Sequence, residues 1–152
     1  MPPRLELRFE SDSDGTGRLL AFVHRHPFSG GGSAWFHIRE ILEFGNHLSS
    51  TFPLIQGTEV VIKGGEWMSG SNPPRLETVL LALRVYPIGT TGTIGLHVQV
   101  GEGDLEAERE EARAKLCVEL LTDYESLRTF GNAIVHLLQA PGAVASLHPN
   151  AV

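Results

Sequence analysis

Alternation of apolar and polar residues restricts the fold of this chain more than any other feature. In the segment LELRFE, Leu5, Leu7 and Phe9 alternate with charged residues, and TIGLHVQV at 93–100 repeats the same period of two. This period places one face of a β-strand in a core and leaves the other in solvent. Similar strand segments are predicted at 18–26, 58–68, 77–87 and 112–121.

Short turn sequences join several of these segments. SDSDGTG at 11–17 and IGTTG at 88–92 consist of residues that favour tight turns and positive φ angles. Strands joined by such turns pair as antiparallel hairpins. The sequence therefore predicts one antiparallel sheet of about six strands.

Two segments have helical spacing instead. An apolar stripe follows 38–52 and stops before Pro53, which cannot continue a helix. A second stripe follows 122–139, where Thr122 and Glu125 form a capping-box pattern. We therefore expect an α+β fold in which two amphipathic helices cover one face of the single sheet.

The two predicted helices share the tripeptide Phe-Gly-Asn at 44–46 and 130–132, and their apolar stripes match around it. Glycine inside a helix costs about 1 kcal/mol relative to alanine. Gly45 and Gly131 therefore indicate that the helices lie side by side and approach each other or the sheet closely. The alternative is a chance similarity between two short amphipathic helices.

Length and composition are typical of one globular domain, with 152 residues of which 41% are hydrophobic and 20% charged. We expect a single domain over 1–152, with flexible ends at 1–3 and 140–152. No apolar run reaches the roughly 18 residues of a membrane-spanning helix, and the N-terminus lacks the apolar core of a signal peptide. The single cysteine, Cys117, fits a reducing compartment and is predicted to be inert in a buried strand. These features favour a cytoplasmic protein without a membrane partner.

Most of the net charge of −6 is concentrated in one segment, EGDLEAEREE at 102–111, which alone carries −5. An acidic loop with no basic stripe elsewhere disfavours nucleic acid as a partner, and favours a protein partner with a basic surface. The candidate partner-binding residues are Glu102, Asp104, Glu106, Glu108, Glu110 and Glu111.

The glycine-rich stretch HPFSGGGSAWF at 26–36 lacks the features of a phosphate loop, because no GxxxxGK[ST] or GxGxxG pattern is present and an extended 34–36 separates the glycines from the helix. We interpret it as a flexible connector or β-bulge. The sequence also lacks a GxSxG nucleophile elbow. No catalytic residue and no cofactor is therefore predicted.

Histidines and aromatic residues surround this stretch. His24 and His26 lie on one face of a strand and could form a zinc site with His37 or Glu40, but solvated or hydrogen-bonded histidines are the favoured interpretation and no metal is expected. The aromatic residues either pack in the core or line a ligand groove or interface. The candidates are Phe28, Trp35 and Trp67.

The polar face of the predicted sheet is a further candidate surface, because both helices would cover the opposite face. It suits an interface with a partner or with a second copy, and it is also compatible with an ordinary solvated face. Its predicted residues are Arg8, Leu80, Ala82, Arg84, Tyr86, His97, Gln99, Lys115 and Glu119.

The segments FSGGGSAWF, GGEW, LETVLLALRVYPIGTTGTIGLHVQV and CVELLTDYESLRTF, with a helix ending in FPL, resemble a group of small uncharacterised bacterial proteins over residues 17–139. The order of elements is also similar to that of WapI-type immunity proteins, which neutralise toxins in the cytosol of the producing cell. The second resemblance implies an α+β fold and a binding activity, and it supplies no catalytic residues.

The expected function is therefore a non-catalytic cytosolic binding protein, an immunity-type inhibitor whose acidic 102–111 segment meets a basic patch on its target. The alternative is a small-ligand-binding protein or enzyme that uses the region around Trp35, Trp67, His24 and His26.

Overall fold

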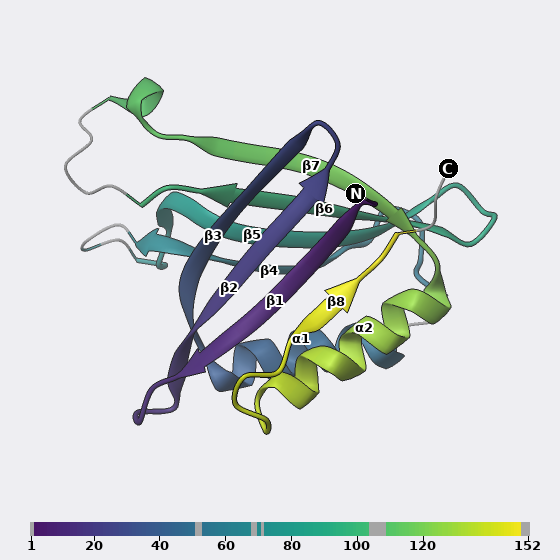
Figure 1. Ribbon diagram of the computed structural model, residues 1–152, viewed down its shortest axis with the longest axis horizontal. Helices are drawn as coiled ribbons and strands as arrows, with labels where there is room; N and C mark the ends of the chain where they lie inside the picture. Colours follow the sequence, from purple (N-terminus) through teal and green to yellow (C-terminus); the bar gives the residue numbers. More distant parts are fainter. Residues whose placement is uncertain (1, 51–52, 68–69, 71, 104–108, 150–152) are drawn as a thin grey trace.

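The computed structural model describes residues 2–50, 53–67, 70, 72–103 and 109–149. Helices and strands follow the α+β pattern that the sequence predicts (Figure 1). In chain order the elements are β1 (Arg4–Ser11), β2 (Thr16–Arg25), β3 (Phe28–His37), α1 (Ile38–Ser50), β4 (Val60–Trp67), β5 (Leu76–Ile88), β6 (Thr93–Gly101), a short 3₁₀ turn (Glu110–Ala112), β7 (Lys115–Thr122), α2 (Tyr124–Leu137) and β8 (Ala145–Leu147).

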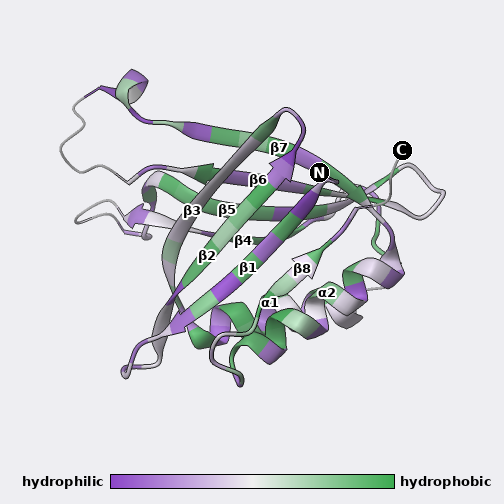
Figure 2. Cartoon of the chain, in the orientation of Figure 1, coloured by the Kyte–Doolittle hydropathy of each residue, from purple (hydrophilic) through white to green (hydrophobic). Residues whose placement is uncertain are grey.

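The strands form two antiparallel sheets of four strands each, so the prediction of a single six-stranded sheet is wrong. Sheet A has the order β3-β2-β1-β8, and sheet B has the order β4-β5-β6-β7. Figure 1 shows sheet A crossing in front of sheet B, and the apolar faces of both sheets contribute to one core. The alternation of apolar and polar residues indicates that each strand buries one face. It does not indicate which strands pair within the same sheet. Figure 2 shows the same alternation along β1, β2 and β7.

The glycine run lies inside β3, which corrects the prediction of a flexible connector. Gly30 and Gly32 face sheet B, and a Cβ on Gly32 would lie 2.9 Å from the Leu80 carbonyl oxygen. A Cβ on Gly30 would lie 3.1 Å from Leu116. The glycines therefore let β3 lie directly against the neighbouring sheet, which larger side chains would hold further away.

The two helices lie side by side (Figure 1), and their backbones come close together at the two glycines. A Cβ on Gly131 would lie 2.6 Å from the Gly45 carbonyl oxygen, and one on Gly45 would lie 2.9 Å from the Gly131 carbonyl oxygen. The predicted close packing is confirmed. The helices do not cover one sheet, however, because α1 packs against β3 and β4 while α2 packs against β1 and β8. They close one side of the space between the sheets.

Helix α2 begins one residue later than the capping-box pattern predicts. Asp123 is the N-cap, and its carboxylate accepts a hydrogen bond of 2.7 Å from the Ser126 backbone N–H. Thr122 is instead the buried last residue of β7. An Asp N-cap satisfies an otherwise unpaired helix N–H as well as a Thr does, so helix α2 is capped although Thr122 belongs to β7.

Two further expectations differ from the structure. The tail at 140–152 was expected to be flexible, but Ala145 and Leu147 are buried in β8, which pairs with β1, and 150–152 lie outside the described residues. A three-residue strand is too short to show a clear period of two. Cys117 is exposed, because it alternates with the inward-facing Val118 on β7.

Candidate binding surface

The edges of the two sheets meet where β3 lies against β4, and we call this line the seam. A Cβ on Gly64 would lie 2.7 Å from the ring of Phe36, so the glycine allows this close approach. Trp35 on β3 and Trp67 at the end of β4 flank the seam with 59% and 54% of their surfaces exposed. Both line one cavity of about 440 Å³, which we call the seam cavity. These tryptophans therefore belong to a surface and not to the core.

Carboxylates and an ammonium group from three parts of the chain lie around the two indoles. Trp35 and Trp67 apart, the seam cavity is lined by Asp12, Asp14, Thr16, Phe36, His37, Glu40 and Lys63. The carboxylates come from the β1–β2 turn and from the first turn of α1, and Lys63 comes from β4. Glu40 was predicted only as a possible zinc ligand, and Asp12, Asp14 and Lys63 were not predicted from the sequence, because tertiary packing alone brings the β1–β2 turn to β4.

The β1–β2 turn holds its carboxylates in fixed positions. The Asp12 N–H donates to the Thr16 carbonyl oxygen at 2.8 Å, and the Thr16 N–H donates to the Asp14 carboxylate at 3.1 Å. The Ile38 N–H donates to the Gly15 carbonyl oxygen at 3.0 Å, which ties the turn to the start of α1. Hydrogen bonds from the Thr16 side chain and backbone lower the pKa of Asp14 below its ordinary value, because they stabilise the ionised form.

A second cavity of about 650 Å³, which we call the sheet groove, continues from the seam cavity over the outer face of sheet B. The two cavities share Glu40, Lys63 and Trp67. Helix α1 forms one wall, and the strands of sheet B form the floor. The remaining lining residues are Glu43, Phe44, His47, Glu59, Val61, Ile62, Val79, Ala82, Arg84, His97 and Gln99.

A row of interacting polar side chains crosses the outer face of sheet B. Arg84 pairs with Glu59 at 3.1 Å and lies 5.7 Å from the centre of the Tyr86 ring. The Tyr86 hydroxyl donates to Glu119 at 2.6 Å. Burial, together with this bond to Glu119, raises the pKa of Tyr86 to about 12. Burial, followed by the Arg84 charge, lowers the pKa of His97 below its ordinary 6.5. The row therefore presents a neutral imidazole and an unionised phenol at neutral pH.

Most residues predicted for the polar sheet face lie together on the outer face of sheet B. Two do not. Arg8 belongs to β1 and therefore to sheet A, because the strands divide between two sheets. Leu80 packs against the core, since a bulge opposite Gly64 and Gly65 shifts the alternation along β5. The same bulge places Val79 on the floor of the sheet groove.

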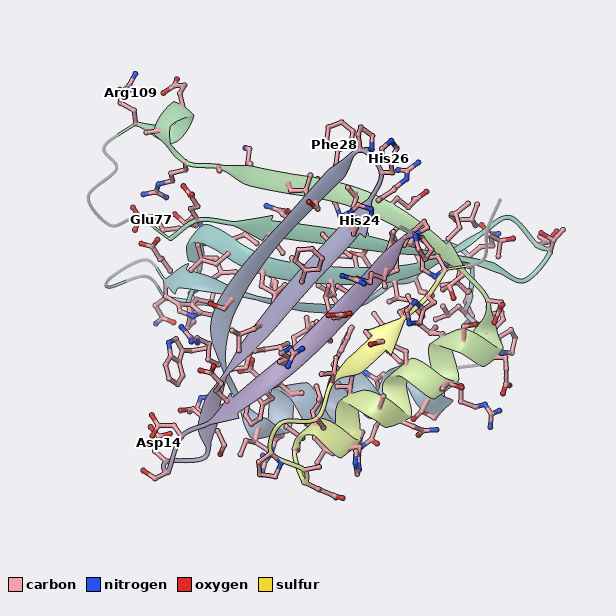
Figure 3. All side chains as sticks on the ribbon, in the orientation of Figure 1. Asp14, His24, His26, Phe28, Glu77 and Arg109 are labelled. Atoms are coloured by element: carbon pink, nitrogen blue, oxygen red, sulfur yellow. The ribbon has the colours of Figure 1, made fainter. Side chains whose placement is uncertain are left out.

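Phe28, His24 and His26 lie far from the two tryptophans. Figure 3 shows Phe28 and His26 at the β2–β3 turn, at the opposite end of the hairpin from Asp14. Trp35 lies seven residue steps along β3 from Phe28, a distance of about 23 Å. The hypothesis of one site containing both the tryptophans and this histidine pair is therefore wrong. Within the described ranges, no three His, Cys, Asp or Glu side chains are grouped as metal ligands.

The acidic segment begins and ends at the same end of sheet B as Trp67. It follows β6 and precedes β7, whose ends pair as Gly101 with Lys115, and Figure 3 shows Arg109 and Glu77 at this end. Glu102 and Glu111 are exposed, and the Glu102 carboxylate accepts a 3.2 Å hydrogen bond from the Ala114 N–H. Three predicted partner-binding residues and one side chain lie outside the described residues: Asp104, Glu106, Glu108 and the side chain of Glu110.

Comparison with known proteins supplies no relative. No family model matches the chain, and neither the curated proteins nor the solved structures contain a match. In the part of the chain that the structure describes, no helix combines the length and apolar character needed to cross a bilayer.

Proposed function

We propose that this chain is a non-catalytic binding protein, an inhibitor of the immunity type that acts in the cytoplasm on a protein with a basic surface. One observation carries the proposal: Trp35 and Trp67, both more than half exposed, flank a cavity in which carboxylates outnumber cations. Tryptophan is the residue most enriched among those that dominate the binding energy of protein interfaces.

Charge at the two cavities supports a basic partner. Among the residues that the structure describes, five carboxylates line the seam cavity and the sheet groove, against the two cations Lys63 and Arg84. Arg84 already pairs with Glu59, which leaves four carboxylates against one ammonium group. The acidic 102–111 segment adds the same sign of charge near the end of sheet B that carries Trp67. The negative electrostatic potential of this surface accelerates the encounter with a basic protein and disfavours binding of an acidic protein.

The shape of the surface also suits a protein partner. The seam cavity and the sheet groove are continuous and extend from the β1–β2 turn across three strands of sheet B. A typical interface buries about 800 Å² on each partner. Burial of the exposed parts of two indoles near its centre would supply the anchors that such an interface needs.

Site-specific photo-crosslinking tests this proposal. A benzophenone amino acid is introduced at Val61 in the sheet groove or, as a matched control, at Val144 just before β8. Each of these residues is 39% exposed. We expect a basic protein to be crosslinked in native cells from position 61 and not from position 144. Equal capture from both positions would contradict a specific surface.

Growth then tests the inhibitory role. We expect the captured protein to arrest growth when it is produced alone, and co-production of the wild-type chain to restore growth. A variant in which both Trp35 and Trp67 are replaced by alanine should restore growth poorly. A captured protein that is harmless when produced alone would exclude an immunity-type function.

A second candidate is a small-ligand-binding protein that uses the seam cavity. Its volume of about 440 Å³ lies within the range of small-molecule sites, and its lining combines aromatic and polar groups. A panel of metabolites tested for thermal stabilisation distinguishes the two candidates. A compound that raises the melting temperature of the wild type, but not of Trp35→Ala, would favour ligand binding.

A further inference from the structure

We infer that the seam cavity receives an arginine side chain from the basic partner, with the guanidinium against an indole and paired with the carboxylates of Asp14 and Glu40. This inference rests on the proposed function, and it names the chemical group that the surface recognises.

The two indoles offer a surface that attracts a guanidinium group. Trp35 and Trp67 come from different sheets and border the same cavity, where each keeps more than half of its surface in solvent. An indole face attracts cations, and a planar guanidinium stacks on it while its N–H groups remain free to donate at its edge. A lysine ammonium lacks this combination, so arginine fits the site better.

The carboxylates of the seam cavity offer negative charge with which a guanidinium group can pair. Asp12, Asp14 and Glu40 line the cavity, and among its described lining residues Lys63 is the single Lys or Arg. Hydrogen bonds within the β1–β2 turn and from Ile38 to Gly15 hold the turn in place before any partner arrives. A site that is already ordered loses little conformational entropy on binding. An anionic ligand would meet an excess of like charge in the same cavity.

Substitution of Lys63 distinguishes an arginine side chain from an anion in the seam cavity, because the effect of Lys63 on binding depends on the sign of the ligand's charge. If an arginine side chain occupies the cavity, Lys63 opposes binding, and Lys63→Met should strengthen it while retaining most of the side-chain length. If the cavity holds an anion, the same substitution should weaken binding. A purely structural role for Lys63 predicts no such reversal.

The two tryptophans make a direct measurement possible. The chain contains only Trp35 and Trp67, so its tryptophan fluorescence and indole N–H resonances report on the seam cavity without a label. The full chain is titrated with acetyl-Gly-Arg-Gly-Arg-Gly-amide and with the matched lysine and glutamate peptides. We expect saturable shifts with the arginine peptide, weaker ones with lysine and none with glutamate.

Charge variants then locate the site. Asp14→Asn and Glu40→Gln should each weaken binding of the arginine peptide by about two- to five-fold, the range expected for exposed ion pairs, and added salt should reduce the difference. Glu125→Gln on α2 is the matched control, because Glu125 is exposed and lies on an element that does not line the cavity. It should leave the affinity unchanged.

The inference and the proposed function fail in different experiments. The inference is overturned if the arginine peptide shifts neither indole resonance, if the glutamate peptide binds equally well, or if Lys63→Met weakens binding. Any of these results leaves the crosslinked partner and the growth assay unaffected. Conversely, loss of the partner in those assays removes the proposed function even where the arginine peptide binds.

Discussion

Replacing Gly131 with alanine is the most direct perturbation of the helix pair. The added methyl group would lie 2.6 Å from the Gly45 carbonyl oxygen and 2.7 Å from the Ser49 backbone nitrogen. Ordinary contacts of a Cβ begin at about 3.4 Å, so the helices would have to separate by about 0.8 Å. Both obstructing atoms belong to the backbone, which cannot move aside by rotating a side chain.

The expected change in stability combines two opposing effects. Overpacking a well-packed region costs about 1–3 kcal/mol, and we expect the upper part of this range because backbone atoms are involved. Alanine recovers about 1 kcal/mol of helix propensity relative to glycine. The net destabilisation is therefore about 2 kcal/mol, which for a chain of this size lowers the melting temperature by about 4–8 °C.

Thermal unfolding followed by circular dichroism, with urea unfolding as a second measure, checks this value. Asn132→Ala is the control, because Asn132 is exposed on the same helical turn and gains alanine propensity without a new contact. Its melting temperature should be unchanged or slightly raised. The double variant Gly45→Ala with Gly131→Ala should lose less stability than the sum of the single variants, since the helices separate only once.

A melting temperature of Gly131→Ala equal to or above that of the wild type would refute this reasoning. It would mean that the helices do not cross at the two glycines, and that their shared tripeptide is a chance similarity.

The remaining predictions concern the tail, the polar row and the acidic segment. Leu147→Ala should lower the free energy of unfolding by at least about 2 kcal/mol in urea, because β8 is part of the core; a value near zero would mean that β8 is dispensable. Because the folded-state pKa of His97 lies below 6.5, the unfolded chain binds a proton more readily. Stability should therefore fall as the pH drops below about 6.5, and His97→Gln should reduce this loss in melting curves at pH 7.5 and 5.5; an identical loss in both proteins would exclude His97 as a cause. Deleting 104–110 should weaken affinity for the captured partner strongly at low salt and little at high salt, as measured by calorimetry; an affinity that is unchanged at low salt would show that the segment does not contribute.

The local elements were predictable because their signals are local. The alternation in β1 and β6 and the apolar stripes of both helices each reflect which side of one element is buried. The division into two sheets was not predictable, since alternation is the same whether a strand packs on a helix or on another sheet. The bulge that moves Val79 outward depends on how β4 pairs with β5, and no residue of β5 alone indicates it.

The candidate site was predictable in part. Trp35 lies between Ala34 and Phe36, and both neighbours are buried, so alternation alone places its side chain outward. Its position beside the same cavity as Trp67 depends on the contact between the edges of the two sheets. The position of Asp14 at this cavity depends on where the tertiary fold places the β1–β2 turn. The sequence therefore named both tryptophans as candidates, with core packing as the alternative, but could not select the polar groups beside them.

The inward-facing residues of β3 connect the glycine run to this surface. In chain order they are Gly30, Gly32, Ala34 and Phe36, so their size increases along the strand. The small residues let β3 contact the middle of sheet B, and the Phe36 ring fills the space beside Gly64 on β4. Small residues thus lie where β3 crosses the middle of sheet B, and Phe36 lies where it reaches the edge strand β4. Trp35 precedes Phe36 and points to the opposite side of β3, so the strand that the glycines allow to lie against sheet B also carries one of the two indoles of the proposed site.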